Sequence, residues 1–514
     1  MFVIILVSAM ALQSLRRVTS LLSATKNGIA RYSTSAVEVN ENGVVEEIKP
    51  FKDIPGPSSL PVIGQLHHYL PNGELYKLEG QDLIFALYKK YGEIVRVDSV
   101  FGRPPMVFLT EPASVAEIMR GETWYPKRTI FLSLEYYKHE YKKPKDEYIG
   151  LVADHGEGWR KVRSIVNPVL LQPKNMKVYQ TGLNEIAQEM IQRIKSKLDE
   201  NYMINDDLVS EFNLWALEST GLVALGCRLN CLDPNLPPGS PAYQLMQCVV
   251  DIFTKFDALN NGINLWRYFP TKLFKRAMKT YEMQEKLSHF FIQKAMLEYK
   301  KKGIGEKGVL QKLMEIDENI AHVMATDMLL GGVDTVSNTV VATLYLLANN
   351  AEKQEKLREE LNSGTDGKRY LKACIKEALR IKPIVSAIVR QINKDYDILG
   401  FRIPKDTMVF CGHHQLSMKD AQFPRAQEFI PERWIVGKGH PLHYAQADPL
   451  VYNPFGFGAR SCIGKRLADL ELETMMSKLI TNFKVEWFGP PIRTEAHFLN
   501  NMAPPHNFKF IPIK

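Results

Sequence analysis

Acidic residues are missing from the first part of the chain. Residues 1–37 contain no Asp or Glu but do contain Arg16, Arg17, Lys26 and Arg31, so this short segment carries half of the formal net charge of +8. The rest of the chain is nearly balanced in charge, unlike the strongly basic surface of a protein that binds nucleic acid. We therefore expect no nucleic-acid partner.

The N-terminus also lacks a long hydrophobic run. The apolar stretch of residues 2–12 is shorter than the roughly 20 residues that a membrane-spanning helix needs. A basic, serine-rich and acid-free segment is typical of a mitochondrial transit peptide, and Arg31-Tyr32-Ser33 resembles its processing site. A secretory signal and a short microsomal anchor are the alternatives. We expect residues 1–35 to be a mitochondrial transit peptide and residues 36–50 to be a linker.

Paired cysteine spacing, internal repeats and low-complexity segments are absent as well. The six cysteines are scattered over 514 residues, which excludes a disulfide framework and suits a reducing compartment. With 45% hydrophobic and 24% charged residues, the composition is that of an ordinary globular protein. One mainly helical domain over residues 51–514 is the simplest account.

Apolar periodicity predicts where some of the elements lie. A helical spacing of apolar residues predicts one long helix over 176–198, and a second is predicted over 350–361 with Asn350 as its N-cap. Alternation predicts a hairpin of strands 93–97 and 105–109 around Gly102, and an extended piece over 397–403.

The most informative segment is a glycine-rich loop with one cysteine. Residues 455–464 read FGFGARSCIG, and an apolar helical run follows. A thiolate at the start of a helix has its pKa lowered by the helix dipole and by unpaired N–H groups. Gly458 and Gly464 allow a tight turn and a close approach to a large flat ligand, and Arg460 can reach an anion. The alternative for Cys462 is a buried free thiol.

A second segment places two glycines in the middle of a predicted helix. Gly331-Gly332-Val333-Asp334-Thr335 interrupts the apolar pattern between His322 and Leu347. Because each glycine costs about 1 kcal/mol relative to alanine, the pair is unfavourable unless a groove over a ligand requires it. The Thr335 hydroxyl can bond back to the carbonyl of Gly331. An incidental helix kink is the alternative.

Weaker patterns occur elsewhere. Glu377 and Arg380 share one helical face, and Trp159 and Arg163 stand one helical turn apart. His440 and His443 form an H-x-x-H pair without further candidate ligands, so we expect loop residues and no metal site.

Together these motifs, in this order from Phe51 to Lys514, resemble the cytochrome P-450 family. F-x-x-G-x-R-x-C-x-G is similar to its haem-thiolate loop, and (A/G)-G-x-(D/E)-T is similar to its central helix. The resemblance implies the mainly α P-450 fold, with a large helical lobe and a small β-rich lobe. It also implies haem b as the cofactor, with Cys462 as the axial ligand of the iron.

The same resemblance assigns roles to further residues. Thr335 and Asp334 would deliver protons to bound dioxygen, while Glu377, Arg380 and Arg433 would form a buried ionic triad. Haem would be held by Trp159, Arg163, Arg390 and Arg460 at its propionates, and by Phe455, Gly458 and Gly464 in the loop. By position alone, the substrate pocket would be lined by residues 325–332, 384–388, 129–149 and 498–504.

Finer features resemble mitochondrial, insect-like members of the family. Arg369, Lys372 and Lys376 form a basic stripe on one helix, and Arg466 follows the cysteine loop. Like charges at this spacing disfavour one another, so the stripe requires an acidic partner. In mitochondrial members that partner is the ferredoxin, which ferredoxin reductase and NADPH supply with electrons. This implies a peripheral protein on the matrix side of the mitochondrial inner membrane.

The resemblance implies a monooxygenase that inserts one atom of O2 into a lipophilic substrate, either a steroid or a xenobiotic. Two alternatives remain. A haem-thiolate isomerase or dehydratase would need no reductant, and a non-catalytic haem-binding protein would need no electron partner. Thr335, Asp334 and the basic stripe argue against the isomerase, and a dependence on NADPH and ferredoxin would separate all three.

Overall fold

The computed structural model describes residues 36–39, 45–60, 64–78, 80–98, 105–142, 147–261, 265–302, 307–364, 367–496 and 499–513. The predicted transit peptide, its processing step and the turn around Gly102 lie outside the described residues, as does Phe498.

Helices make up most of the described chain. The longer ones are α2 (Gly80–Tyr91), α3 (Pro112–Arg120), α5 (Gly156–Leu170), α7 (Gln180–Lys197), α8 (Leu208–Ala224), α9 (Pro241–Thr254), α11 (Lys272–Lys302), α12 (Val309–Ile316), α13 (Glu318–Ala348), α14 (Ala351–Asn362), α15 (Arg369–Ile381) and α17 (Lys465–Asn482). Short helices are α4 (Leu132–Tyr136), α6 (Pro173–Lys177), α10 (Asp257–Asn261), α16 (His413–Ser417), a π-helical turn η4 (Tyr137–Tyr141), and the 3-10 turns η2 (Phe51–Asp53), η3 (Leu66–Tyr69), η5 (Leu265–Arg267), η6 (Pro431–Trp434), η7 (Tyr444–Gln446) and η8 (Gly458–Arg460).

The strands form small sheets. A four-stranded sheet has the order β3 (Ile94–Val97), β4 (Met106–Leu109), β8 (Met408–Cys411), β5 (Ile388–Gln391). Antiparallel pairs are formed by β1 (Ala36–Val39) with β2 (Val45–Ile48), β6 (Tyr396–Ile398) with β7 (Phe401–Ile403), β9 (Phe483–Trp487) with β12 (Phe508–Pro512), and β10 (Thr494–Ala496) with β11 (Asn500–Met502).

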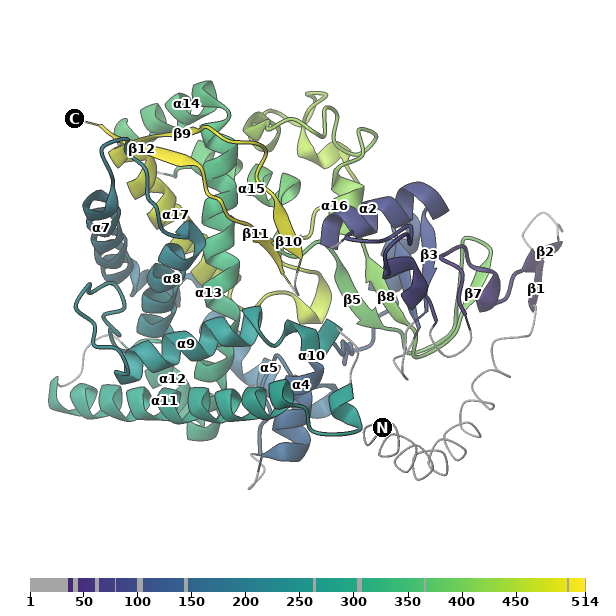
Figure 1. The fold of residues 1–514 in the computed structure, drawn as a ribbon, viewed down its shortest axis with the longest axis horizontal. Coiled ribbons are helices and arrows are strands. Elements are labelled where there is room, and N and C mark those ends of the chain that lie inside the picture. The colour runs from purple at the N-terminus through teal and green to yellow at the C-terminus, as the bar shows by residue number, and fades with distance from the viewer. Residues whose placement is uncertain are drawn as a thin grey trace, which may run out of the picture.

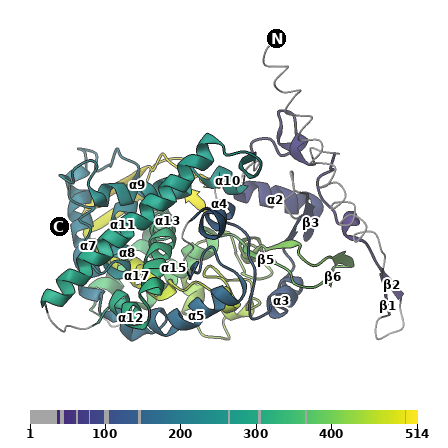
Figure 2. The ribbon, with the colours of Figure 1, turned by 90° about the horizontal axis from the view of Figure 1, so that it is seen from below.

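Helix α13 is the central element of the helical lobe. It runs through the middle of that lobe in Figure 1, and it contacts α8, α11, α15 and α17. Seen from below in Figure 2, α11 lies across it. By length and composition α13 could cross a membrane, but 78% of its apolar window is buried within the fold. It is therefore the core helix around which the other helices pack.

The β-rich lobe has a core of its own. A separate hydrophobic cluster joins residues of the four-stranded sheet, such as Val107 and Val409, to α3 and to the residues before the cysteine loop. Figure 1 shows β3, β5 and β8 together on one side of the helical lobe. The predicted large helical lobe with a small β-rich lobe is confirmed.

The hairpin of strands 93–97 and 105–109 is present, since β3 pairs with β4 in register from Ile94 with Leu109. The piece predicted as extended over 397–403 is a hairpin, β6–β7, that turns at Leu399 and Gly400, where both φ angles are positive. The segment predicted as a linker carries the β1–β2 pair.

The helix predicted over 176–198 is wrong at its start. The chain forms α6, turns at Val178 and Tyr179, and begins α7 at Gln180. The Tyr179 hydroxyl accepts a hydrogen bond from the Val309 N–H (2.6 Å), so a contact distant in sequence holds the turn. The helix after Asn350 is present, with Asn350 at its N-cap position as predicted. The side chain of Asn350 makes no capping hydrogen bond, and its amide donates instead to the carbonyl of Leu346 (2.7 Å).

Candidate active site

The cysteine loop leads from η8 into α17 through one tight turn. The Cys462 N–H donates to the carbonyl of Phe455 (2.8 Å), which closes the loop. Gly458 has φ +69°, and a Cβ there would lie 2.8 Å from an oxygen of Glu122. Gly464, with φ −83°, has ordinary backbone geometry. Of the two predicted glycines, only Gly458 requires the absence of a side chain, and its close neighbour is a carboxylate.

Cys462 is the exposed member of the six free cysteines, yet burial raises the pKa of its thiol. The side chain therefore lies deep within the fold and faces an internal space, not the outer surface. The Gly464 N–H, Arg163 and Arg128 each act to lower the pKa of the thiol, but burial outweighs them. The predicted lowering of the pKa at the helix start is thus wrong for the uncoordinated thiol.

Four arginines gather around this cysteine. They are Arg128, Arg163 of α5, Arg390 of β5 and Arg460 of η8. Burial, together with repulsion from the other arginines, lowers the pKa of Arg460 to about 8 and that of Arg128 to about 10. Glu122 forms a buried ion pair with Arg390. Asp154 also acts on Arg460, and Asp327 acts on Arg128, so carboxylates offset part of the positive charge of the cluster without matching it.

The arginine cluster also has unused hydrogen-bond donors. Among the described residues, the Nε atoms of Arg128 and Arg163 are buried and have no hydrogen-bond partner. Buried guanidinium groups are tolerated when anions pair with them. A large ligand with two carboxylates beside Cys462 would satisfy both the charge and the donors, so these residues fit haem. Arg128 was missed by the sequence analysis, because an isolated arginine before α4 belongs to no motif.

Like Arg390, which donates to Glu122 and to the carbonyls of Val389 (2.9 Å) and Phe457 (3.0 Å), Arg460 uses its donors within the protein. It donates to the carbonyls of Pro126 (2.9 Å), Leu151 (3.2 Å) and Asp154 (2.8 Å). Its guanidinium lies 3.9 Å from the ring centroid of Trp159. Arg460 therefore joins the cysteine loop to the segment before α5, and Trp159 is its stacking platform.

Helix α13 continues without a break through Gly331 and Gly332. The Thr335 hydroxyl donates to the Gly331 carbonyl (2.8 Å), as predicted from the motif. A Cβ on Gly331 would meet no atom within 4 Å, whereas one on Gly332 would lie 2.7 Å from the hydroxyl oxygen of Thr220. Gly331 therefore faces open space inside the fold, and Gly332 permits the close approach of α8.

The side chain of Asp334 points in a different direction from that of its neighbour Thr335. Its carboxylate is buried and accepts a hydrogen bond from the side-chain amide of Asn213 in α8 (3.0 Å). The two side chains of the motif thus leave α13 toward different surroundings.

The predicted ionic triad is brought together in full. Glu377 accepts from Arg380 (2.8 and 3.0 Å) and from Arg433 (2.9 Å), and the side chains of all three are completely buried. The indole N–H of Trp434 (2.9 Å) and the backbone N–H of Ile430 (3.2 Å) also donate to this carboxylate. These last two donors were not predicted, because E-x-x-R carries no information on them.

The basic stripe lies on the outside of the molecule. Arg369, Lys372 and Lys376 are exposed on α15, and Arg466 is exposed at the start of α17. They approach one another across the two helices, since Lys465, Arg466, Lys376 and Lys372 all act to lower the pKa of Asp469, which burial raises. Lys372 also lies 3.7 Å from Glu473.

His440 and His443 accept hydrogen bonds from backbone N–H groups two residues later, at 3.1 Å each. No three His, Cys, Asp or Glu side chains of the described residues are placed to hold a metal ion.

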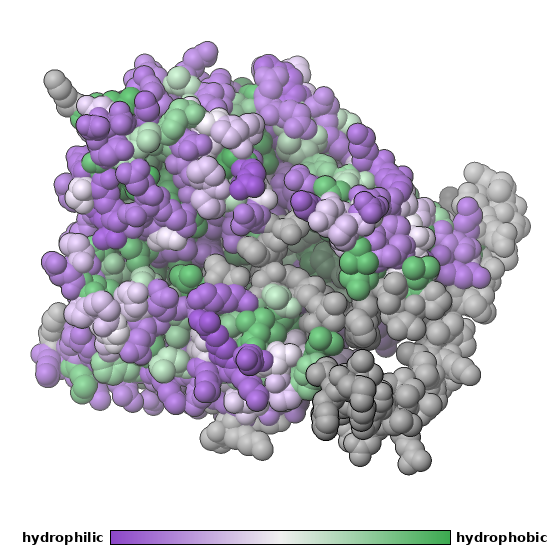
Figure 3. All heavy atoms as spheres, in the orientation of Figure 1, coloured by the Kyte–Doolittle hydropathy of each residue, from purple (hydrophilic) through white to green (hydrophobic). Residues whose placement is uncertain are grey.

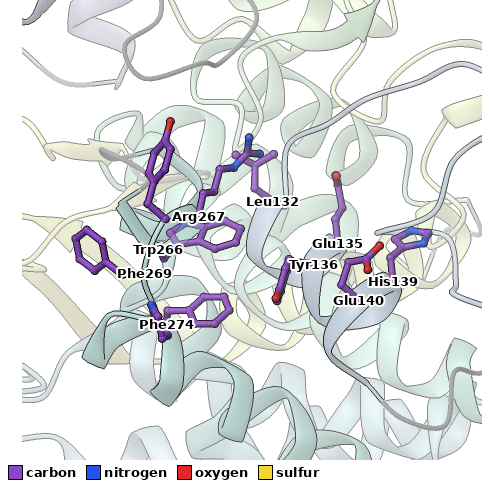
Figure 4. A pocket seen from close by; sticks show the side chains of 11 residues that line it. Leu132, Glu135, Tyr136, His139, Glu140, Trp266, Arg267, Phe269 and Phe274 are labelled. Carbon is purple, nitrogen blue, oxygen red and sulfur yellow. The ribbon is translucent and has the colours of Figure 1, made fainter. Parts of the chain in front are cut away.

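A cavity of about 580 Å³ opens between α4–η4 and the start of α11 (Figure 4). Tyr136 and Phe274 bring aromatic rings to it, and the rings of Trp266 and Phe274 stack with centroids 5.0 Å apart. Glu135, Glu140 and Arg267 supply its charged groups. Its wall from Leu132 to Glu140 belongs to the segment 129–149 that was predicted to line the substrate pocket.

Comparison with known proteins agrees with this geometry. The family model for Cytochrome P450 matches residues 54–510. Cytochrome P450 CYP12A2 of Musca domestica is 34% identical over 91% of this chain and 92% of its own length. Probable cytochrome P450 12b2, mitochondrial, of Drosophila melanogaster is 33% identical over 91% and 90%. Probable cytochrome P450 49a1 of the same species is 32% identical over 86% and 79%.

The family model spans nearly all of the described fold and includes the cysteine loop, the arginines around it and the central helix. The chain therefore belongs to the cytochrome P450 family of monooxygenases, which bind haem b through a cysteine thiolate.

Proposed function

We propose that this monooxygenase is mitochondrial and inserts one atom of O2 into a lipophilic substrate, a steroid or a xenobiotic, with electrons from a ferredoxin. The observation that carries the proposal is the basic surface formed by α15 and α17. Helix α17 starts three residues after Cys462. An electron carrier docked on this surface would approach the haem from the side of its thiolate ligand.

In this proposal Cys462 is the axial ligand, and the arginine cluster holds the cofactor. Arg128, Arg163 and Arg390 would pair with the propionates of haem, while Phe455, Gly458 and Gly464 would shape the loop against it. Bound haem supplies the redox chemistry of O2 activation. Arg460 keeps the loop against the segment before α5, so that Cys462 is presented at a fixed position.

Thr335 has the role of moving protons on the substrate side of the cofactor. Its hydroxyl donates to the carbonyl of Gly331, a residue of α13 that faces open space. A hydroxyl in this position could take a proton from water and pass it on into the open space next to Gly331. Asp334, held by Asn213, takes part once it exchanges this partner for water.

Residues 1–35 are proposed as the transit peptide and residues 51–514 as the catalytic domain, located on the matrix side of the inner membrane. The basic, acid-free leader supports this location. So do several relatives whose names include "mitochondrial", among them probable cytochrome P450 12a5 of Drosophila melanogaster, which is 33% identical.

The aromatic cavity of Figure 4 is proposed as the place where a lipophilic substrate first binds. Its walls are mainly Leu, Phe, Trp and Tyr side chains, which favour apolar compounds.

Reconstitution tests the proposal directly. Wild-type protein should turn over lipophilic steroids or xenobiotics with NADPH, ferredoxin reductase and ferredoxin, and should fail with the flavoprotein reductase of microsomes. Cys462→Ser should lose the red-shifted carbon monoxide band of a thiolate-ligated ferrous haem, because a serine hydroxyl stays protonated. Turnover that needs no reductant would favour an isomerase, and survival of the band in Cys462→Ser would remove Cys462 as the ligand.

A further inference from the structure

The most exposed tryptophan of the described residues lies next to the cysteine loop. Trp124, in the segment between α3 and α4, is 74% exposed, more than any other large hydrophobic side chain that the structure describes. Hydrophilic residues predominate on the face shown in Figure 3, where hydrophobic residues form small separate groups. A tryptophan exposed to this extent leaves a large apolar area in water, which is a feature of binding surfaces.

The backbone on both sides of Trp124 is held in place. The Tyr396 hydroxyl donates to the carbonyl of Gly121 (3.2 Å), and Glu122 pairs with Arg390. On the other side, Arg460 donates to Pro126 (2.9 Å). Trp124 is therefore presented outward by a fixed segment, and its exposure is not that of a loose loop.

A cation accompanies the indole ring. The guanidinium of Arg160, an exposed residue of α5, lies 5.4 Å from the ring centroids of both Trp124 and Tyr125. Arg160 also donates to the Tyr125 hydroxyl (3.3 Å). Tryptophan and arginine dominate the energetics of protein–protein interfaces, and groups that are ordered before binding lose less entropy when they bind.

The Trp124–Arg160 pair and the basic stripe flank the same loop. Residues 122–126 contact the loop at Gly458 and Arg460. At the other end of the loop, Lys465 follows Gly464, lies 5.3 Å from the Phe455 ring and leads into the basic surface around Asp469. The outer side of the cysteine loop thus lies between two surfaces. One is the basic stripe, and the other is the Trp124–Arg160 pair.

We propose that Trp124 and Arg160 anchor the protein that delivers electrons, an acidic one-electron carrier, on the side of the loop opposite to the basic stripe. This inference rests on the proposed function, because it assumes such a carrier. The stripe attracts the carrier over a distance and sets the association rate, while the indole is buried on contact and slows dissociation. Arg160 supplies the charge that selects an acidic partner over a neutral or basic one.

The test compares Trp124→Ala, Trp124→Phe and Arg160→Gln with wild type, using an acidic mitochondrial [2Fe–2S] ferredoxin. Phe488→Ala is the matched control, because Phe488 is also an exposed aromatic residue (47%) with a cation, Lys509, over its ring at 5.7 Å. Trp124→Ala should raise the ferredoxin concentration for half-maximal turnover by about ten-fold or more, as expected for an interface hot spot. The ferredoxin concentration for half-maximal turnover of Trp124→Phe should lie between those of wild type and Trp124→Ala. For Phe488→Ala it should equal the wild-type value.

Two further readouts separate an anchor from a structural role. Turnover driven by hydrogen peroxide in place of ferredoxin, and the carbon monoxide spectrum, should stay unchanged in Trp124→Ala. The dependence of ferredoxin affinity on salt should keep its slope in Trp124→Ala and become flatter in Arg160→Gln.

Three outcomes would overturn the inference: wild-type ferredoxin affinity in Trp124→Ala, an equal loss of peroxide-driven turnover, or a loss of binding to phospholipid vesicles without any change toward ferredoxin. If no ferredoxin supports turnover of the wild type, the proposed function itself fails and the anchor with it.

Discussion

Buried charged side chains in this protein are either fully paired with groups of opposite charge or gathered with too few of them. Glu377 receives donors from Arg380, Arg433, Trp434 and Ile430, so its charge is fully paired inside the fold. Around Cys462, in contrast, arginines outnumber carboxylates, and the pKa of Arg460 falls to about 8. A paired charge indicates a structural role, whereas an uncompensated cluster of one sign indicates a place for an anionic ligand.

Thr335→Ala is expected to separate oxygen consumption from product formation. Without the hydroxyl, proton delivery is impaired, and general acid assistance of this kind contributes roughly 10²–10⁴-fold. NADPH should then be consumed largely to form hydrogen peroxide, with normal haem content, as measured by the ratio of product to NADPH. Thr335→Ser keeps a hydroxyl and should retain most of the coupling between NADPH use and product. If Thr335→Ala is coupled as well as wild type, Thr335 has no role in proton delivery and serves only through its bond to the backbone.

Asp327→Asn is expected to change how stability depends on pH. Asp327 of α13 accepts from the N–H groups of Leu151 (2.6 Å) and Val152 (3.2 Å), and burial raises its pKa from 3.8 to about 6. The folded state thus binds the proton more tightly than the unfolded state. The resulting stabilisation is present below pH 4 and is lost as the pH rises through 6.

Asn keeps a carbonyl oxygen for both N–H groups and does not titrate. Relative to Asp327→Asn, wild type should therefore lose roughly 2–3 kcal/mol of unfolding free energy between pH 4 and pH 7. Denaturant unfolding of both proteins across this range measures the difference, and parallel pH profiles would show that the pKa of Asp327 is the same in the folded and the unfolded state.

Among the elements, α13 and the cysteine loop were the most predictable, because the residues that define them are adjacent in sequence. The bond from Thr335 to Gly331 follows from helical spacing alone. The turn at Tyr179 could not be predicted, because the Val309 N–H that holds it belongs to a distant segment. Arg128 was missed for the same reason: only the fold brings it beside Cys462.

Gly332→Ala and Gly331→Ala should differ although the residues are adjacent. A Cβ on Gly332 meets Thr220 of α8 at 2.7 Å, so the variant should lower the thermal midpoint as α8 is pushed away. A Cβ on Gly331 meets nothing within 4 Å, and alanine favours the helix by about 1 kcal/mol, so this variant should unfold no earlier than wild type. Its substrate affinity should change, because the methyl group enters the open space beside Thr335.

Combining Gly332→Ala with Thr220→Ala removes the closest atoms of the clash and should restore part of the stability. Thermal unfolding of the three variants measures these effects. Equal midpoints for Gly331→Ala and Gly332→Ala would contradict the close approach of α8.

For the whole molecule, the two lobes were expected from the family resemblance that the motifs carry, but the surface chemistry was not. The stripe on α15 was predicted from helical spacing, whereas its continuation onto α17 around Asp469 depends on how the two helices pack. The exposure of Trp124 likewise depends on contacts from β5, β6 and η8 that hold its segment.

Lys372 and Lys376 changed together to Gln should raise the ferredoxin concentration needed for half-maximal turnover. Exposed charges act over about 8 Å at physiological salt, so the defect should be largest at low ionic strength. The haem spectrum and the substrate affinity should stay unchanged. Lys300 and Lys301 of α11, also exposed, provide a control pair with the same change in charge; if both double variants behave alike, the stripe is not the docking site.

The four-stranded sheet has a consequence for how the chain is made. Its central contact, β4 with β8, joins Met106 to Met408, so the β3–β4 hairpin leaves the ribosome long before its neighbour exists. Until β8 arrives, one edge of β4 is unpaired and its apolar residues are uncovered, which invites association with other chains. Chaperones that shield this hairpin during synthesis, and slow expression at low temperature in a heterologous host, should therefore raise the yield of correctly folded protein.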